Sequence, residues 1–352
     1  MFLKIYQKYI VKNFLLIVLK TFFVFLSLTI IMGIFTELSF FSKLDVHFYL
    51  PILLVLMNSL SVLYTIFPFI FLISAQFFFI KILDSNELIA FKNYGLSNNK
   101  ILSIIALTSF LAGIVIISVF YNTSAILKFK YLDMKNDYTN DNKYLASVTE
   151  NGLWIKDDFG SEVYFINAER VSPNKLHNVD ILVFNKDFEL NRSIFAIEVN
   201  ISNTKWLMSE AIVIKPDGNR EIINNYSLVS NFNYNKINNL YSDLSALNIY
   251  ELMKARNDYK NINYSITEID IHIKRIFSYP FFLTIMTIFS SIIMLNIKHQ
   301  KPKIFYAIGG ILISVLIYYI NFFFGALGKN EQIPVILSVW LPIILLSIIS
   351  LI

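Results

Sequence analysis

The side chains that commonly carry out catalysis are scattered along this sequence. Its four histidines stand far apart, and no two of them have the HExxH spacing that binds zinc. They are His47, His177, His272 and His299. Residues 325–330 superficially resemble a phosphate-binding loop, but they lack its full spacing and the Ser or Thr that holds magnesium. We therefore expect no metal site and no nucleotide site, so any ATP-driven work would need a partner protein.

A short polar island at residues 84–97 separates two long apolar runs. Asp84 can cap a helix that has Glu87 at its third position, and Gly95 is well placed as the left-handed residue that ends it. Ser97 can then cap the helix that follows. The island is thus predicted to contain a helix of about two to three turns that ends near Gly95.

Two interpretations of this helix stay open. In the first, Glu87 only caps the helix. In the second, Leu88 and Phe91 form an apolar face at i, i+3 spacing, and the helix couples the protein to a cytoplasmic motor. The Glu87 carboxylate would then pair with Arg or Lys in a groove of that motor. Only the second interpretation predicts that replacing Glu87 weakens association with the motor.

The composition places these residues in a membrane protein. Of 352 residues, 56% are hydrophobic and only 16% are charged, and the mean hydropathy is +0.57. There is no cysteine, which excludes a disulfide framework and thiolate metal or redox chemistry. The net charge of +5 comes largely from lysines beside apolar segments, so it indicates membrane topology rather than affinity for nucleic acid.

Six apolar runs are predicted to cross the membrane, three on each side of a polar insert. They cover residues 14–35, 51–83, 101–120, 276–297, 304–324 and 333–352. Polar groups within them are few, with little more than Lys20 near one end and Asn321 near another. Such a lining would suit an acyl chain better than an ion or solute. The alternative is that these aromatic and aliphatic side chains simply face lipid or other helices.

Lysines are distributed unequally between the loops. Nine lie in the N-terminal segment, in residues 81–100 and in residues 298–303, whereas only Lys43 and Lys329 lie in the short loops opposite. The positive-inside rule places the lysine-rich loops in the cytoplasm. Both termini and the polar island are therefore expected to be cytoplasmic, and the polar insert is expected on the far side of the membrane.

The insert begins where the composition changes, near Asn122. Its short β-branched and aromatic runs predict strands at residues 153–155, 163–166, 181–184, 194–201, 206–208 and 211–214. Turn clusters occupy residues 156–160, 185–187, 202–204 and 215–218, and residues 248–260 revert to a helical pattern. This spacing favours an all-β sandwich or jelly roll.

The predicted fold class is an α-helical polytopic membrane protein with an inserted all-β jelly-roll domain. Residues 1–122 would hold the first three spans, with the coupling helix at 84–95. Residues 123–270 would hold the jelly roll and the segment that returns to the membrane. Residues 271–352 would hold the last three spans.

Motifs along nearly the whole chain resemble those of one transporter family. Residues 85–95 are similar to its pattern of Ser-Glu-Leu followed by a small residue and Gly, with one residue inserted between Ser and Glu. Residues 151–157 resemble the Gly-Leu-Trp-x-Lys-Asp opening of its periplasmic domain. Further similarities are Ile276-Phe277 ahead of Pro280, then Gly325, Ile333-Pro334 and Leu341-Pro342. With its order of spans and insert, the chain resembles the lipopolysaccharide export permeases of the LptF/LptG family, and the G-type paralogue more than the F-type.

The resemblance implies a permease half of an ABC exporter that extracts lipopolysaccharide from the bacterial inner membrane. Its partners would be a paralogous LptF-like permease, a cytoplasmic LptB-like ATPase dimer and a single-span LptC-like bridging protein. ATP-driven closure would move the lipid from a cavity between the halves to the jelly roll, whose edge strands would continue into a periplasmic bridge. The residues implied to meet the ATPase are Glu87, Leu88, Phe91, Tyr94 and Gly95. Those implied to line the lipid cavity are Leu26, Glu37, Lys43, Ile66, Phe67 and Asn321.

One departure concerns the lipid head group. The G-type paralogue tends to place lysines at the periplasmic end of span one, but residues 33–39 contain no lysine and instead include Glu37, with Lys43 the nearest base. Either the glycolipid carries fewer phosphates or the paralogue supplies the charges. Rival functions are a permease for another lipid-bearing cargo, as in lipoprotein release, and a membrane-anchored binding or scaffold protein that acts through its β domain. A lipid transferase is a weaker rival, because no catalytic groups converge in the sequence.

Overall fold

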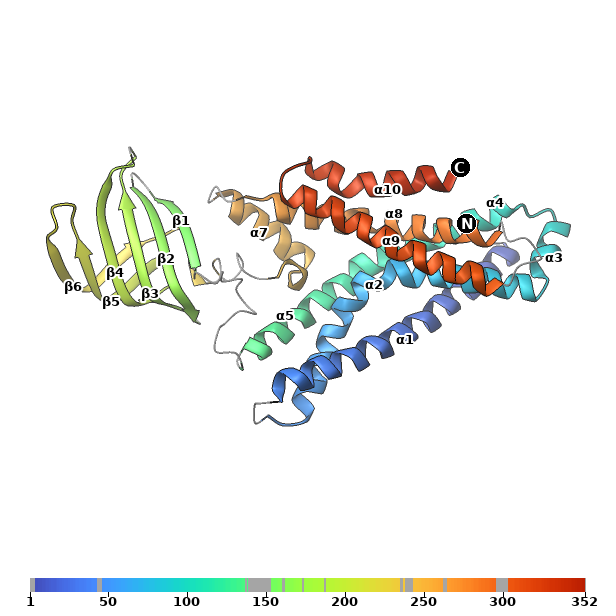
Figure 1. The fold of residues 1–352 in the computed structure, drawn as a ribbon, viewed down its shortest axis with the longest axis horizontal. Coiled ribbons are helices and arrows are strands. Elements are labelled where there is room, and N and C mark those ends of the chain that lie inside the picture. The colour runs from blue at the N-terminus through green and yellow to red at the C-terminus, as the bar shows by residue number, and fades with distance from the viewer. Residues whose placement is uncertain are drawn as a thin grey trace. The chain divides into compact units, whose positions relative to one another are not determined.

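The structure, a computed structural model, divides the chain into two compact units (Figure 1). One unit comprises Met1–Lys128 and Thr267–Ile352 and is helical, and the other comprises Phe129–Ile266 and contains a β-sheet. The residues described are 4–42, 46–136, 138, 153–159, 162–172, 174–186, 188–234, 237, 243–261, 265–295 and 303–351.

Five described helical segments are long and apolar enough to cross a membrane. They are Ile5–Phe41 (α1), Tyr49–Asp84 (α2), Asn98–Lys135, Thr267–Leu295 (α8) and Ile308–Lys329 within α9 (Lys303–Lys329). A further apolar helix, α10 (Val335–Leu351), has 17 residues and is shorter than these. The prediction of a helical membrane protein is therefore confirmed, with five candidate spans among the described residues.

The third candidate span continues beyond its predicted end at Phe120. It consists of α4 (Asn98–Val115), a π-helical turn η1 (Ile116–Tyr121) and α5 (Asn122–Asn136). The change of composition at Asn122 does not end the helix, because the polar side chains donate hydrogen bonds back to the preceding turn. Asn122 Nδ2 donates to the Ser118 carbonyl at 2.8 Å, and Thr123 Oγ1 donates to the Val119 carbonyl at 2.9 Å.

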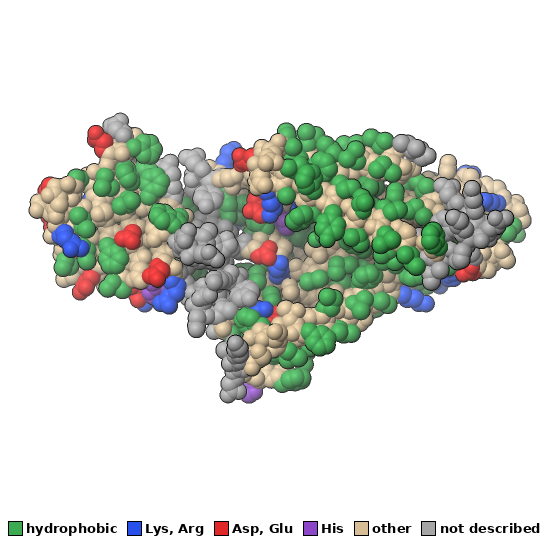
Figure 2. All heavy atoms as spheres, in the orientation of Figure 1, with side chains coloured by type: hydrophobic (Ala, Val, Ile, Leu, Met, Phe, Trp, Pro, Cys, Tyr) green, Lys and Arg blue, Asp and Glu red, His purple; other side chains and the backbone are tan. Residues whose placement is uncertain are grey.

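Two helices, α2 and α8, form the centre of the helical unit. α2 packs against α1, α8 and α9, and α8 also packs against α4 and α10. Gly113 permits the contact of α4 with α8, because a Cβ at this position would lie 2.7 Å from the Cα of Pro280. The small residue at this position thus allows the two helices to approach closely. The face of the helical unit seen in Figure 2 is covered largely by hydrophobic side chains, as expected for a surface in contact with lipid or a partner.

The described part of the second unit contains six antiparallel strands that pair in sequence order. They are β1 (Leu153–Phe159), β2 (Glu162–Ser172), β3 (Lys175–Phe184), β4 (Leu190–Asn200), β5 (Lys205–Ile214) and β6 (Arg220–Val229). The 3-10 turn η2 (Leu244–Ala246) and α7 (Ile249–Asn261) follow, and α7 confirms the predicted helix at 248–260. Asn248 and Glu251 cap α7 reciprocally, each accepting a hydrogen bond of 2.9 Å from the other's backbone.

The strands bend along a line that crosses the sheet. In β3 the buried positions change from Leu176 to Val179, and in β5 they change from Met208 to Ala211, so the inward-facing alternation shifts by one residue. Asn178 in β3 lies at the bend with a φ of 49°. Buried residues from both sides of the bend belong to one apolar core. The shift therefore keeps the apolar side chains of both halves on the same inner face.

This bend explains one of three errors in the strand prediction. Residues 206–208 and 211–214 belong to the single strand β5, because the shift of alternation at Ser209–Glu210 resembles a break between strands. The prediction also placed a turn at 156–160, whereas β1 continues to Phe159. Strand β6 was not predicted, since it is an exposed edge strand with Asn224 and Asn225 at its middle.

Candidate functional site

The polar island forms a short helix, α3 (Glu87–Asn93). Its N-cap is Asn86, which has a φ of 57°, so the predicted capping by Asp84 is wrong. Asp84 is instead the last residue of α2. The predicted C-terminus is confirmed, because Gly95 has a φ of 77° and its N–H donates to the Lys92 carbonyl at 2.9 Å. This is one of the two hydrogen bonds of a Schellman motif, and the Leu96 N–H donates the other, at 3.0 Å, to the Phe91 carbonyl.

One face of α3 packs on the helical unit. Leu88 is 8% exposed, and the ring of Phe91 meets that of Tyr9 in α1 edge-on, with centroids 6.3 Å apart. Glu87 is half-buried, and its carboxylate lies close to the Tyr9 side chain. The capping role considered for Glu87 is therefore replaced by a contact between helices. Tyr94 is 87% exposed and lies outside this contact.

The helix that follows is capped as the sequence predicts. The side chain of Ser97 accepts a hydrogen bond of 3.4 Å from the Lys100 N–H at the start of α4. The turn between Gly95 and Ser97 therefore ends one helix and begins the next without an intervening loop. Such a short connection fixes the direction of α3 relative to α4.

The predicted lipid-cavity residues lie in separate places. Phe67 is buried and lines an apolar groove among α1, α2, α4 and η1, whereas Asn321 lines a second cavity among α2, α8, α9 and α10. Leu26 and Ile66 are half-buried and pack against the core of the helical unit. The remaining two are Glu37, which is buried in α1, and Lys43, which lies outside the described residues.

The second cavity contains charge that the sequence prediction missed. Its volume is about 260 Å³, and its lining includes Arg275 and His272 of α8 together with Asn321 and Tyr318 of α9. The prediction began this span at 276 and therefore left Arg275 out, but α8 begins at Thr267. The candidate span that contains α8 therefore includes Arg275, in addition to the polar groups predicted for the spans. The periodic run of apolar residues that extends back to Ile269 was the available signal.

Arg275 is accommodated by a glycine on the neighbouring helix. A Cβ at Gly325 of α9 would lie 1.6 Å from Arg275 Nη2, so no other residue fits there without moving the guanidinium. The Nε of Arg275 is buried and has no hydrogen-bond partner among the described residues. An arginine held inside a membrane span with unused hydrogen-bonding capacity is typical of a functional site. Its chemistry suits a carboxylate or phosphate.

A kink in α2 lies beside this cavity. Pro68 has no N–H, which leaves the carbonyl of Tyr64, four residues earlier, without its helical partner. The hydroxyl of Tyr279 in α8 donates a hydrogen bond to that carbonyl, and the two tyrosine rings stack with centroids 4.6 Å apart. Tyr121, the last residue of η1, also contacts the Tyr64 ring at 5.0 Å. Its hydroxyl lies 3.0 Å from His272 Nε2, so the kink, η1 and α8 meet at one aromatic cluster.

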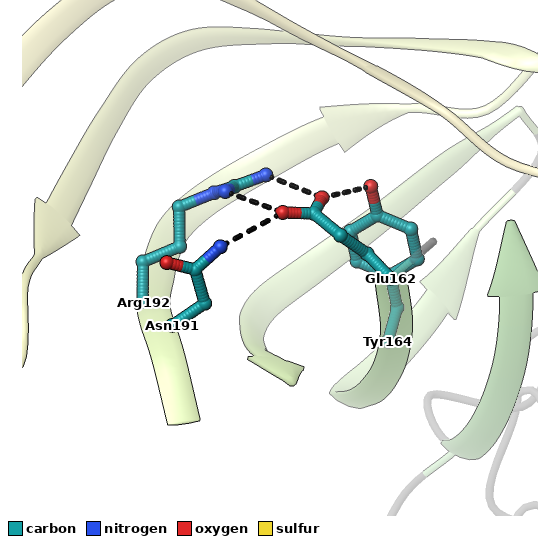
Figure 3. A network of polar contacts seen from close by, with 4 residues as sticks. All are labelled: Glu162, Tyr164, Asn191 and Arg192. Carbon is teal, nitrogen blue, oxygen red and sulfur yellow. Dashed lines mark hydrogen bonds and ion pairs between the residues drawn. The ribbon is translucent and has the colours of Figure 1, made fainter. Parts of the chain in front are cut away.

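The sheet unit contains a polar network centred on the Glu162 carboxylate (Figure 3). Arg192 donates two hydrogen bonds of 2.8 Å to the two carboxylate oxygens of Glu162. Asn191 and Tyr164 donate to the same carboxylate at 2.9 and 2.8 Å. Burial works to raise the pKa of Glu162, but the hydrogen bonds from Arg192 and Tyr164 outweigh it and hold the pKa below its ordinary value. Burial and the bond to Glu162 raise the pKa of Tyr164 to about 12. A carboxylate so fully engaged ties β2 to β4 and is not poised for catalysis.

A second carboxylate joins the two edges of the sheet. Asp157 in β1 is 1% exposed and accepts hydrogen bonds from Ser230 Oγ at 2.6 Å, Asn231 N at 3.0 Å and Asn231 Nδ2 at 2.8 Å. Ser230 and Asn231 directly follow β6. Asp157 is the aspartate of the Gly-Leu-Trp-x-Lys-Asp motif. The motif therefore has a structural role here, since it fastens the first strand to the chain leaving the last.

The described residues show neither a metal centre nor convergent catalytic groups. No three His, Asp or Glu side chains among them gather closely enough to hold a metal ion. Two buried or half-buried carboxylates, Glu162 and Asp157, are engaged in hydrogen bonds within the sheet unit. Arg275 is the charged group best placed to meet a ligand, because it lines a cavity and its Nε is unpaired.

Comparison with known protein families agrees with this arrangement. The chain matches the family described as "Lipopolysaccharide export system permease LptF/LptG" over residues 8–352. No curated protein matches the chain significantly. The match covers the spans on both sides of the insert and the insert itself, so it applies to the chain as a whole. The chain belongs to the lipopolysaccharide export system permease LptF/LptG family, the permease component of an ABC transport system.

Proposed function

We propose that this chain is one permease half of an exporter that moves lipopolysaccharide from the outer leaflet of the inner membrane toward the outer membrane. The observation that supports this most strongly is the family match over residues 8–352, which coincides with a helical membrane unit carrying an inserted sheet. In this proposal α10 serves as the sixth span, because its 17 residues extend over about 26 Å, close to the thickness of a bilayer core. The resemblance of the motifs favours the G-type paralogue.

The orientation we propose places both termini and α3 in the cytoplasm. The nine lysines of the N-terminal segment and of residues 81–100 and 298–303 support it, against two in the short loops opposite. The sheet unit is then periplasmic. We assign it to a jelly-roll domain, in keeping with its bent sheet around one apolar core. Its edge strands β1 and β6 leave backbone groups available for a bridging protein.

The partners we propose are a paralogous permease, a cytoplasmic ATPase dimer and a single-span bridging protein. The helix α3 would be the contact with the ATPase. Leu88 and Phe91 already pack within the chain, so the outward surface that includes Tyr94 would enter the groove of the ATPase. Glu87 would act partly through its interaction with Tyr9. This interaction would fix the orientation of α3 on α1. ATP-driven closure could then be transmitted directly into α1.

The Arg275 cavity supplies a positive charge that the end of span one lacks. Residues 33–39 contain no lysine, and Glu37 among them is buried. Arg275 lies eight residues from the start of α8, about 12 Å along the helix from the end that would be periplasmic. We propose that its guanidinium holds a phosphate or carboxylate of the glycolipid on the way to the periplasm.

Copurification from native membranes tests the proposal. A tagged full-length chain is extracted in mild detergent, and every protein and lipid that accompanies it is identified by mass spectrometry. We expect an ATPase, a second six-span protein and a lipid A-type glycolipid. Recovery of the chain with envelope proteins and no ATPase would instead support a scaffold that acts through the sheet unit. Recovery with an ATPase and a lipoprotein would indicate a permease for that cargo.

A further inference from the structure

Two adjoining cavities on the helical unit together have the shape and polarity of a lipid. The larger is an apolar groove of about 740 Å³ among α1, α2, α4 and η1. The smaller is a polar cavity of about 380 Å³ between the first turns of α1 and α4. Gln7 of α1 and Ile104 of α4 line both, so the polar cavity opens into one end of the groove.

Almost none of the side chains that line the groove can form a hydrogen bond with an occupant. Of its sixteen lining residues, only Gln7 and Thr108 are polar. The Thr108 hydroxyl is satisfied within its own helix, because it donates to the Ile104 carbonyl at 2.7 Å. Leu107 and Leu111 on the rim are 59% and 54% exposed. An occupant of the groove therefore needs to be apolar along its whole length.

The length of the groove suits an acyl chain. It extends from Gln7 to Phe22 of α1, which is about 22 Å along the helix. The length exceeds the half-thickness of a bilayer core, about 15 Å, so one acyl tail fits within it.

The polar cavity has the chemistry for an anionic head group. Its lining includes Lys100, Asn99 and Ser103 of α4 and Tyr6 of α1. Lys100 is exposed and has no ion-pair partner among the described residues. A phosphate placed there would meet a positive charge and several hydrogen-bond donors, while its glycerol-linked tail enters the groove.

We propose that an anionic glycerophospholipid binds between α1 and α4, with its phosphate at Lys100 and one acyl chain in the groove. This inference rests on the orientation proposed above, which places Lys100 at the cytoplasmic surface. The lipid then belongs to the cytoplasmic leaflet and is distinct from the exported glycolipid, whose head group lies at the opposite surface. By filling the space between α1 and α4, it would hold apart two helices that otherwise touch only weakly.

Lipid retention by the intact complex tests the site. The complex containing the full-length chain is incubated with vesicles of phosphatidylethanolamine and phosphatidylglycerol, isolated again in mild detergent, and analysed for bound lipid by native mass spectrometry. We expect one retained phosphatidylglycerol per chain. Lys100→Glu should lower its retention about five-fold or more relative to phosphatidylethanolamine, since one charge pair at a membrane surface is replaced by repulsion. The double variant Leu107→Trp/Leu111→Trp should lower the retention of both lipids, because indole rings would fill the groove.

Matched controls and a second measurement keep the test decisive. Ile114→Trp changes an exposed residue of the same helix outside the groove, and Lys8→Glu changes an exposed lysine outside both cavities, so both should retain lipid normally. Equal retention by all variants overturns the proposal. So does a photocrosslinker at Leu111 that captures a protein helix or a lipid A-type glycolipid. Release of glycolipid with ATP is measured separately, so its failure alone counts against the export function and not against this site.

Discussion

The hydrogen bond from Tyr279 to the kink in α2 can be tested by a double-mutant cycle. Tyr279→Phe keeps the ring that stacks on Tyr64 and removes only the hydroxyl. The Tyr64 carbonyl then has no donor, because Pro68 cannot supply the helical N–H. Hydrogen bonds between membrane helices average about 0.6 kcal/mol and reach about 1.7 kcal/mol, and we expect this one to contribute about 1–1.5 kcal/mol.

We expect Tyr279 and Pro68 to be energetically coupled. Pro68→Ala restores an N–H that can reach the Tyr64 carbonyl, so the Tyr279 hydroxyl is no longer its sole donor. In that background Tyr279→Phe should cost only about 0–0.5 kcal/mol, which gives a coupling free energy of about 1 kcal/mol. Any effect of straightening α2 occurs in both Pro68→Ala variants and cancels in the cycle.

The measurement is the free energy of unfolding of the full-length chain in mixed micelles, titrated with a denaturing detergent and followed by the circular dichroism of the helices. Tyr319→Phe is the matched control, since this tyrosine is 64% exposed on α9 and its hydroxyl should contribute nothing measurable. If the Tyr279 and Pro68 variants are additive within about 0.3 kcal/mol, the hydroxyl does not compensate for the missing N–H and the reasoning is wrong.

Four further outcomes are expected. Glu87→Ala should weaken copurification of the ATPase while the chain still inserts and folds, because α3 loses its hold on α1. Gly325→Ala should reduce glycolipid retention as Arg275→Ala does, since the added Cβ would lie 1.6 Å from Nη2. Asp157→Ala should destabilise the sheet unit by about 3–5 kcal/mol, measured by denaturant titration of tryptophan fluorescence, because it deprives three donors of a buried carboxylate. The folded-state pKa of Glu162 is lowered, so its stabilisation is complete above the ordinary value of 4.5 and is lost as the pH falls through the lower folded value. Glu162→Gln should remove this part of the acid sensitivity.

Each of these outcomes has a control. Tyr9→Phe separates a contact of Glu87 with Tyr9 from a contact of Glu87 with the ATPase. If Tyr9→Phe lowers copurification of the ATPase as much as Glu87→Ala does, the whole effect comes from the contact with Tyr9. Gly309→Ala should leave glycolipid retention unchanged, since nothing lies within 4 Å of a Cβ there. Asp180→Ala removes an exposed carboxylate of β3 and should alter stability by less than about 0.5 kcal/mol. Glu210→Gln, at an exposed position of β5, should keep the full dependence on acid. A similar loss in any control would contradict the assigned cause.

The reliable local signals were residues whose type specifies a backbone conformation or a backbone hydrogen bond. Gly95 adopts the left-handed conformation that glycine tolerates best, and Ser97 caps α4 because its hydroxyl reaches the N–H three residues later. Gly113 marks a close helix contact. Prediction failed where the composition changes inside a continuous helix or strand. Asn122 continues a helix because its amide bonds back to the preceding turn, and Ser209–Glu210 lies at a bend rather than between strands.

The candidate site was only partly visible in the sequence. The island at 84–97 stood out because it interrupts apolar runs, and its helix was placed to within a few residues. Arg275 was missed because it follows Lys274 in a charged segment, which looks like part of the preceding loop. Its significance depends on Gly325, which is 50 positions away in the sequence and leaves the space that the guanidinium occupies.

By itself the sequence determined that the protein lies in a membrane, the order of its segments and its family. These follow from hydrophobic content, run lengths and local motifs, which are properties of neighbouring residues. Only the tertiary structure decided which polar groups meet. Tyr279 donates a hydrogen bond to the Tyr64 carbonyl, which has no helical donor because of Pro68. Asp157 of β1 accepts hydrogen bonds from the segment that follows β6. Such pairs join residues about 70 to 210 positions apart, and no local pattern records them because each depends on how distant segments pack.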